Sequence, residues 1–160
     1  MTSPPRLAAP LEAYRIGDPL GRWPVYSPEG ARTVSGRWHG RGDRVIYASE
    51  HYSTAMLEML ARWNGPPPGE QHFIRIEIPE GTTYEVIEPR DLPDWHIPGS
   101  PAAREAGHGW YARGESAILL VPSVVARMDR NVIINAGHPD FPGLRPGPET
   151  PVWWDERLFL

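Results

Sequence analysis

The chain contains no cysteine among its 160 residues. Disulfides, thiolate metal sites and cysteine nucleophiles are therefore excluded, and a structural zinc site is nearly excluded as well. The first ten residues lack the basic start and apolar run of a secretory signal, and no stretch of the sequence has the length needed to cross a bilayer. We expect a cytoplasmic protein without membrane contact, and nothing in the sequence requires a metal.

An excess of positive charge is also missing. The chain has 16 Lys and Arg residues against 20 Asp and Glu residues, which gives a net charge of −4. No basic cluster is interleaved with aromatic residues, so we expect no direct contact with nucleic acid. One local exception is a Gly-rich stretch that can bind an anion, because it carries four arginines: Arg32, Arg37, Arg41 and Arg44.

Several familiar catalytic motifs are absent. The sequence has neither a phosphate-binding loop with Lys and Ser/Thr nor the glycine pattern of a dinucleotide-binding fold. It also lacks paired histidines at helical metal spacing and a Gly-x-Ser-x-Gly nucleophile turn. Any active site must therefore be assembled from residues that are dispersed along the chain.

Proline is abundant, with 20 residues, and each one fixes φ and removes a backbone donor. We therefore expect short elements with many irregular connections. Residues 1–12 are predicted to form a flexible N-terminal arm, and residues 13–160 a single domain. The order of elements predicts an α/β (α+β) fold: one compact domain with a small mixed central β-sheet and few helices.

The expected strands differ in their patterns. Residues 72–78 alternate apolar and polar side chains, and residues 84–87 are predicted to pair with them. Residues 117–121 form a continuous apolar run, typical of a strand buried on both faces. Further strands are predicted at residues 14–16, 45–48, 131–135 and, as an edge strand, 153–160.

Two helices are expected. The first is capped by Ser53 or Thr54 and stopped by the Gly/Pro stretch at 65–68, and its apolar stripe is Met56, Met59, Leu60 and Trp63. The second follows Ser100, which suits an N-cap before Pro101, and runs to Ala112.

Glu58 has two interpretations. It lies roughly opposite the apolar stripe with Arg62 four residues later, which favours an exposed i, i+4 ion pair. The same geometry directs the carboxylate into a cleft if another segment covers that face of the helix. The sequence alone favours the surface pair.

The other candidate residues also have structural explanations when taken singly. Arg37 adjoins Trp38 and can stack on it, and Tyr47 ends a strand and can belong to the core. Arg15 lies in a predicted strand. The remaining candidates suit helix caps or turns: Ser116, Ser123, Asn135 and His138. A function cannot be assigned from any one of these residues.

Together, however, the motifs resemble the RES-domain family, which is named for recurring Arg, Glu and Ser residues. The resemblance runs from about position 14 to position 159, and six weak motifs occur in the family's order. They are Tyr14-Arg15-Ile16, Ser35-Gly36-Arg37-Trp38-His39, Val45-Ile46-Tyr47-Ala48, Ala55-Met56-Leu57-Glu58, Glu115 to Leu119 with Val121-Pro122-Ser123, and Asn131 to Pro139, followed by a fitting Asp155 to Phe159. Ala136 departs from the family, which often has proline there.

This resemblance implies an ADP-ribosyltransferase-like fold and a toxin paired with an Xre/Cro-like helix-turn-helix antitoxin. It implies NAD as substrate, consumed by transfer of ADP-ribose to a protein acceptor, by hydrolysis or by phosphorolysis. Glu58, Arg37 and Tyr47 would be the catalytic residues. Contacts to NAD would come from Arg15, Arg37, Tyr47, a serine for which Ser116 is preferred over Ser123, and Asn135. A homodimer is compatible with the resemblance.

These residue types suit cleavage of the nicotinamide–ribose bond. A carboxylate stabilises the oxocarbenium character that develops on the ribose, and Glu58 fits that role. Guanidinium groups match phosphates, which fits Arg15 and Arg37. Tyr47 can stack on the nicotinamide or the sugar, and transfer to a protein is slightly favoured over the other acceptors.

Two other classes of function remain open from the sequence. A ribonuclease toxin would favour a basic groove and a His or Lys acid-base pair, which the acidic balance does not suggest. A non-enzymatic binding module would use the seven tryptophans as interface anchors. Release of nicotinamide from NAD would separate both classes from the enzyme interpretation.

Overall fold

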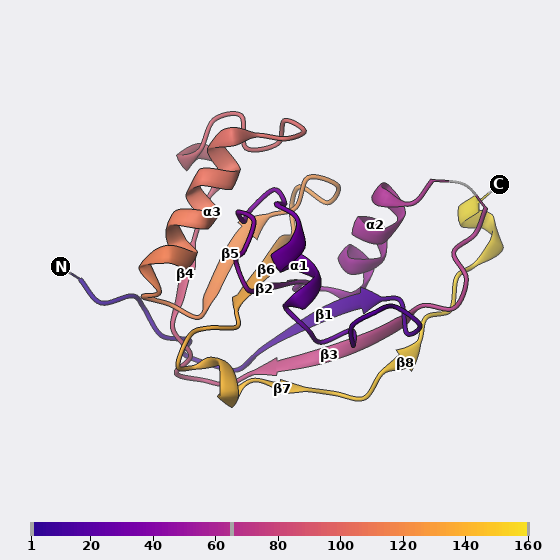
Figure 1. The fold of residues 1–160 in the computed structure, drawn as a ribbon, viewed down its shortest axis with the longest axis horizontal. Helices are drawn as coiled ribbons and strands as arrows, with labels where there is room; N and C mark the ends of the chain where they lie inside the picture. Colours follow the sequence, from indigo (N-terminus) through magenta and orange to yellow (C-terminus); the bar gives the residue numbers. More distant parts are fainter. Residues whose placement is uncertain (1, 65, 160) are drawn as a thin grey trace.

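A computed structural model of the protein describes residues 2–64 and 66–159. Within these residues, eight strands form one sheet, which is accompanied by three α-helices (Figure 1). The strands are β1 (Leu11–Gly17), β2 (Val45–Ser49), β3 (His72–Ile78), β4 (Tyr84–Val86), β5 (Ile118–Pro122), β6 (Arg130–Asn135), β7 (Arg145–Pro146) and β8 (Thr150–Pro151). The helices are α1 (Glu29–Thr33), α2 (Tyr52–Arg62) and α3 (Pro101–Arg113), with 3-10 turns η1 (Pro89–Asp91), η2 (Phe141–Gly143) and η3 (Glu156–Phe159).

The sheet has the strand order β4-β5-β6-β2-β1-β3-β7, and β8 also pairs with β3. The β4–β5 pair is parallel, and the other pairs are antiparallel. This arrangement confirms the predicted single domain with a mixed sheet and few helices. No helix within the described residues is long and apolar enough to cross a membrane.

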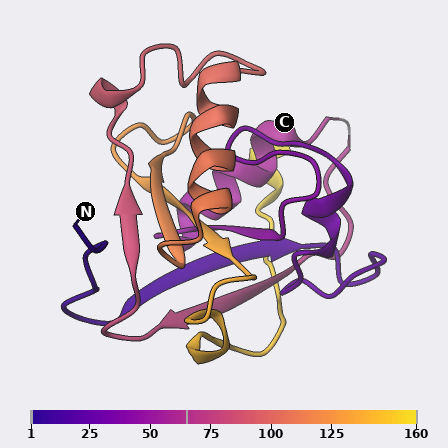
Figure 2. The same cartoon turned by 60° about the vertical axis from the view of Figure 1, so that its left-hand side comes forward.

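Strand β5 is buried on both faces, as its apolar run predicts. Ile118 and Leu120 belong to one hydrophobic cluster, which also contains the isoleucines of β3. Leu119 and Val121 belong to a second cluster, formed with α3 and three buried tryptophans. Figure 2 shows α3 beside the β4–β5 end of the sheet, where it covers this second cluster.

In the middle of the sheet, β1 and β2 pair over a much shorter length than the other long strands do. β1 pairs with β3 along its whole length, from Leu11 opposite Ile78 to Gly17 opposite His72. With β2 it pairs in register only at Tyr14 and Ser49. The two halves of the sheet therefore separate here, and the separation creates space between β1, which is only partly buried, and the largely buried β2.

Helix α3 begins and is packed as its sequence dictates. Ser100 accepts a hydrogen bond from the backbone N–H of Ala103 at 3.1 Å, and Pro101 occupies the first turn, as predicted. Gly107 sits where the helix meets the loop at Trp38, and a Cβ atom there would lie 1.8 Å from the carbonyl oxygen of Trp38. Close packing of helix against loop therefore requires a glycine at this position.

Gly107→Ala is expected to lower the free energy of unfolding by about 3 kcal/mol or more, because the clash involves backbone rather than a flexible side chain. Gly109→Ala is the matched control. Of the described residues, its added methyl group would meet only the Arg113 guanidinium, at 3.6 Å, and alanine is the better helix former by about 1 kcal/mol. Urea denaturation of both variants tests the prediction, and equal stabilities would contradict it.

Two strand predictions are wrong. β4 does not pair with β3 but runs parallel to β5, because both edges of β3 are occupied by β1 and by β7 with β8. The expected edge strand at 153–160 is replaced over residues 156–159 by η3, where Asp155 accepts hydrogen bonds from the backbone and guanidinium of Arg157. Leu160 lies outside the described residues.

The structure also differs from the expected N-terminal arm and helix cap. Residues 5–7 are held against the turn before β4, with Leu7 N–H donating to Thr82 O at 2.9 Å, and β1 already begins at Leu11. Met1 and Gly65, the residue of the expected helix stop, lie outside the described residues. The N-cap of α2 is His51 rather than Ser53 or Thr54, and the Thr54 hydroxyl donates to Asp129 at 2.7 Å.

Candidate active site

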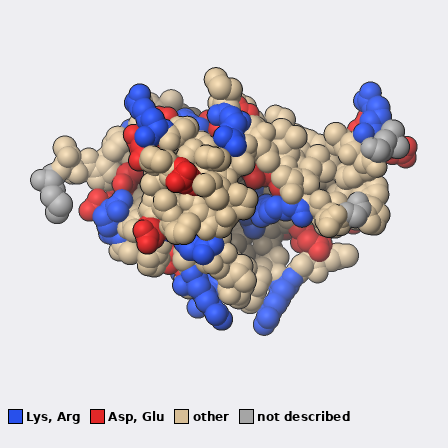
Figure 3. Space-filling view, turned by 90° about the horizontal axis from the view of Figure 1, so that it is seen from above, with Lys and Arg blue, Asp and Glu red and all other residues tan. Residues whose placement is uncertain are grey.

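A cavity of about 640 Å³ lies where β1 and β2 separate. Ligand pockets typically measure roughly 300–1,000 Å³, so a molecule larger than a single sugar fits. Its walls come from β1, β2, α2, β6, the loop around α1 and the residues after β5. Seen from above, this side of the molecule has a hollow with basic side chains at its edges (Figure 3). The polar and charged side chains lining the cavity are Tyr14, Arg15, Ser35, Arg37, His39, Tyr47, Ser49, Glu58, Arg62 and Asn131.

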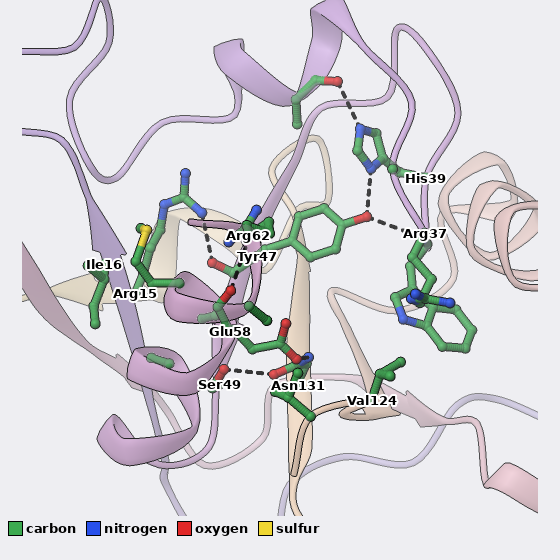
Figure 4. A pocket seen from close by; sticks show the side chains of 18 of the residues that line it. Arg15, Ile16, Arg37, His39, Tyr47, Ser49, Glu58, Arg62, Val124 and Asn131 are labelled. Carbon is green, nitrogen blue, oxygen red and sulfur yellow. Dashed lines mark hydrogen bonds between the residues drawn. The ribbon is translucent and has the colours of Figure 1, made fainter. Parts of the chain in front are cut away.

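Glu58 points from α2 into this cavity (Figure 4). Its Oε1 atom accepts hydrogen bonds from the Ser123 hydroxyl at 2.8 Å and from Asn131 Nδ2 at 2.7 Å. Asn131 is itself oriented by the Ser49 hydroxyl, which donates to Asn131 Oδ1 at 2.7 Å. Within the described residues no hydrogen bond reaches Glu58 Oε2. One carboxylate oxygen is therefore fixed, and the other remains available to a ligand.

The exposed ion pair between Glu58 and Arg62 does not form. Arg62 Nε approaches only the backbone oxygen of Glu58, at 3.5 Å. The face of α2 that turns inward carries Thr54 and Ala55 as well as Glu58, whereas Trp63 of the expected apolar stripe is 39% exposed. Glu58 therefore lies on the side of the helix that β6 and the segment after β5 cover.

Tyr47 lines the same cavity from β2, and its hydroxyl makes two contacts with the neighbouring loop. The hydroxyl oxygen accepts from the backbone N–H of Trp38 at 3.1 Å and lies 2.6 Å from Nδ1 of His39. Burial raises the pKa of Tyr47, and the Trp38 hydrogen bond with the charges of Arg62 and Arg37 opposes this only in part. The side chain is therefore a neutral phenol at neutral pH.

Arg15 bridges the opening between β1 and β2. Its Nε donates to Val25 O at 2.6 Å and its Nη1 donates to Tyr47 O at 2.9 Å, and Nη2 has no partner in the part of the chain that the structure describes. Burial, reinforced by the charge of Arg62, lowers the pKa of Arg15 to about 10. The guanidinium thus stays charged at neutral pH while it joins the two halves of the sheet at the cavity wall.

Arg37 lies across the cavity from Arg15. Its Nη1 donates to the backbone oxygens of Trp95 and Ile97, at 2.7 and 3.0 Å, which ties the loop after α1 to the segment before α3. The predicted stacking of Arg37 on Trp38 is not the main contact, because Trp38 is buried and packs on Trp95 instead. Among residues 2–64 and 66–159 no hydrogen bond uses the remaining guanidinium nitrogens, Nε and Nη2, which are left for a ligand.

The structure does not bring all the predicted residues together. Ser116 is buried away from the cavity, where its hydroxyl donates to Glu85 and accepts from the Trp110 indole, so the preference for Ser116 over Ser123 is not supported. Asn135 accepts from the Gly137 N–H and His138 from the Asp140 N–H. Asn135 ends β6 and His138 lies in the turn that follows, and both are outside the cavity lining, as their interpretation as turn residues states.

Six polar lining residues were missed as site candidates, and three of them bear directly on the chemistry of the site: Asn131, Arg62 and His39. Asn131 was only part of a motif, Arg62 was the expected surface partner of Glu58, and His39 was only part of the segment around Arg37. Arg62 was the easiest to find, because a helix that turns Glu58 inward also turns the residue four positions later to the same side. With Arg62, three arginines and one glutamate surround the cavity, which favours an anionic ligand with a cationic reacting centre near the carboxylate.

Comparison with known proteins identifies the family. The RES domain family model matches residues 12–155. A protein of Sphingobium named Prs ADP-ribosylating toxin is 31% identical over 160 residues, which is 96% of this chain and 94% of that protein. A protein of Yersinia enterocolitica named Toxin Res is 33% identical over 115 residues, covering 70% of this chain and 75% of its own.

A solved structure shows the same fold. A chain in the crystal structure of the M. tuberculosis MbcT-MbcA toxin-antitoxin complex matches with a TM-score of 0.62 at 16% identity, over 92% of this chain and 86% of that one. The predicted family and fold are thereby confirmed, and the predicted function, a toxin that uses NAD, agrees with the names of these relatives. Match length and identity together establish that this chain belongs to the RES domain family.

Proposed function

We propose that this protein is the toxin of a toxin-antitoxin pair, that it acts in the cytoplasm, and that it cleaves the nicotinamide–ribose bond of NAD and transfers ADP-ribose to a protein. The observation that carries the proposal is Glu58, with Oε1 fixed by Ser123 and Asn131 and Oε2 free in a cavity that three arginines line. The relative named Prs ADP-ribosylating toxin supports this chemistry and a protein as acceptor.

In the proposed reaction the bond between the nicotinamide nitrogen and C1′ of the ribose breaks, and its electron pair stays on the nitrogen. Nicotinamide leaves as a neutral molecule, so no strong general acid is needed. Positive charge develops on the ribose, where the Glu58 carboxylate stabilises it and can accept a hydrogen bond from a ribose hydroxyl. The acceptor then forms the new bond at C1′ and releases a proton.

The arginines support recognition of the pyrophosphate. Arg15 Nη2 and the free Nε and Nη2 of Arg37 offer planar donors from opposite walls, and Arg62 adds a third charge. Their combined charge concentrates an anion on a protein whose overall charge is −4. Tyr47 supplies an aromatic ring between these groups for contact with the nicotinamide or the sugar.

We further propose an Xre/Cro-like helix-turn-helix antitoxin as partner. Support comes from the family resemblance and from the solved neighbour, which was crystallised as a toxin-antitoxin complex. Co-expression with a small helix-turn-helix protein encoded by a neighbouring gene should relieve growth arrest and give a complex on gel filtration. The same column run with the toxin alone tests the predicted homodimer.

The deciding experiment incubates the purified protein with NAD labelled on its adenylate, with and without phosphate and cell lysate. Label on a protein band supports transfer, whereas free ADP-ribose or phosphorylated ADP-ribose assigns water or phosphate as the acceptor. Absence of nicotinamide release under all conditions contradicts the proposal and favours a ribonuclease or a binding module.

Arg37→Ala should mainly weaken binding of NAD. Loss of one charge-assisted contact costs about 1.5–3 kcal/mol, so KM is expected to rise roughly 10- to 100-fold with a smaller change in kcat. Arg145→Ala, an exposed arginine of β7 outside the cavity, is the matched control and should leave KM unchanged. Steady-state measurement of nicotinamide release gives both constants, and an unchanged KM for Arg37→Ala would argue against a phosphate contact.

A further inference from the structure

His39 is a buried side chain, 3% exposed, at the wall of the cavity. Its Nε2 lies 2.9 Å from Ala31 O and 2.8 Å from Val34 O, on the loop that carries α1. Carbonyl oxygens only accept hydrogen bonds, so Nε2 must carry the proton. In the neutral ring Nδ1 then has a lone pair, and the group within reach is the Tyr47 hydroxyl at 2.6 Å.

This arrangement determines the direction of the Tyr47 O–H bond (Figure 4). The phenol donates its proton to His39 Nδ1, and one of its lone pairs accepts the backbone N–H of Trp38. One lone pair of the hydroxyl oxygen remains unused. Because Tyr47 lines the cavity and its proton is held by His39, its hydroxyl can offer a bound molecule an acceptor but not a donor.

The loop before His39 is closely packed on this pair. Gly36 lies so close that a Cβ atom would be 2.7 Å from the His39 ring and 2.9 Å from the Tyr47 hydroxyl oxygen. Its own backbone N–H donates to His39 O at 3.1 Å, and its carbonyl accepts from Arg104 at 3.1 Å. The His39 ring consequently has little freedom to rotate away from Tyr47.

We propose that His39 is a positioning residue that acts through Tyr47. By accepting the phenolic proton, it keeps the Tyr47 oxygen as an acceptor for an N–H or O–H donor of the bound substrate, either the carboxamide of nicotinamide or a ribose hydroxyl. The proposal rests on the proposed function, in which NAD occupies this cavity. Tyr47 contacts the substrate, and His39 does not.

Two substitutions separate this role from a structural one. His39→Gln places its amide group near the position of Nε2, which retains bonds to Ala31 O and Val34 O but removes the acceptor for Tyr47. His39→Asn places an amide oxygen near the position of Nδ1, which retains the acceptor but removes those loop bonds. We expect His39→Gln to lower kcat about tenfold at near-normal stability, and His39→Asn to retain kcat within about threefold at reduced stability.

Tyr47→Phe tests whether His39 acts through the Tyr47 hydroxyl. If His39 acts through the hydroxyl, His39→Gln should lower kcat no further in the Tyr47→Phe background. An undiminished loss in that background overturns the proposal, and so does a larger kcat loss for His39→Asn than for His39→Gln. Thermal unfolding of all four variants, measured in parallel, reports the structural contribution of the loop bonds.

An NMR measurement keeps this inference independent of the activity. Long-range ¹H–¹⁵N spectra of the His39 ring in the intact protein should show a protonated Nε2 and an unprotonated Nδ1, and Tyr47→Phe should shift the Nδ1 resonance. A ring protonated at Nδ1 would overturn the proposal. If the wild-type protein releases no nicotinamide but shows the expected tautomer, the proposed function fails and the Tyr47–His39 geometry stands.

Discussion

Glu58→Gln is expected to lower kcat for nicotinamide release at least about 100-fold and to abolish growth arrest in cells, with little change in KM. The glutamine oxygen can still accept from Ser123 and Asn131, as Glu58 Oε1 does at 2.8 and 2.7 Å. The substitution therefore removes the negative charge at Oε2 and leaves the packing of α2 intact. Because that charge matters most when the ribose becomes cationic, the loss should appear in kcat.

The matched control is Glu85→Gln. Glu85 is also a carboxylate held by a serine hydroxyl, that of Ser116, and by an arginine, Arg113, but it lies outside the cavity lining. This variant should keep the activity and lose some stability. Full NAD consumption by Glu58→Gln would exclude the proposed stabilisation of the oxocarbenium, and equal losses in both variants would indicate a general effect on folding.

The contacts of Glu58 explain which parts of the site were predictable from sequence. Helix α2 follows from its apolar spacing and its start near residue 53, but the face of the helix that is covered depends on which strands lie beside it. β6 and the segment after β5 bring Asn131 and Ser123 against that face, at separations of 73 and 65 residues. Contacts that distant leave no trace in a helical pattern, so only the ordered family motifs identified Glu58.

The fold was more predictable than the site, for a related reason. Strands such as β3 and β5 can be predicted because the burial of each strand face is visible in the local sequence. In β3 apolar and polar residues alternate, and β5 is a continuous apolar run. Strand pairing, by contrast, depends on distant parts of the chain. The predicted pairing of β4 with β3 was wrong because β7 and β8, two residues each, occupy that edge of β3. Strands that short have too few residues to show any period.

Arg15→Met is expected to reduce both stability and substrate binding. Methionine fills similar space but leaves Val25 O and Tyr47 O without their donor, which bonds them at 2.6 and 2.9 Å. Each unpaired carbonyl costs about 1–3 kcal/mol, so the free energy of unfolding should fall by about 3 kcal/mol and Tm by roughly 6–12 °C. KM for NAD should rise at least about tenfold, because the charged donor Nη2 disappears as well.

Arg15→Lys separates the two contributions. A lysine ammonium keeps the positive charge but is a single point donor, so it cannot span Val25 O and Tyr47 O while also facing a phosphate. The variant should recover part of the binding but little of the bridge between β1 and β2, where Tyr14 opposite Ser49 is the pairing in register. Calorimetry gives Tm, and KM is measured at a temperature where each variant is folded. A normal KM for Arg15→Met would assign the arginine to the sheet alone, and pyrophosphate binding would then rest on Arg37 and Arg62.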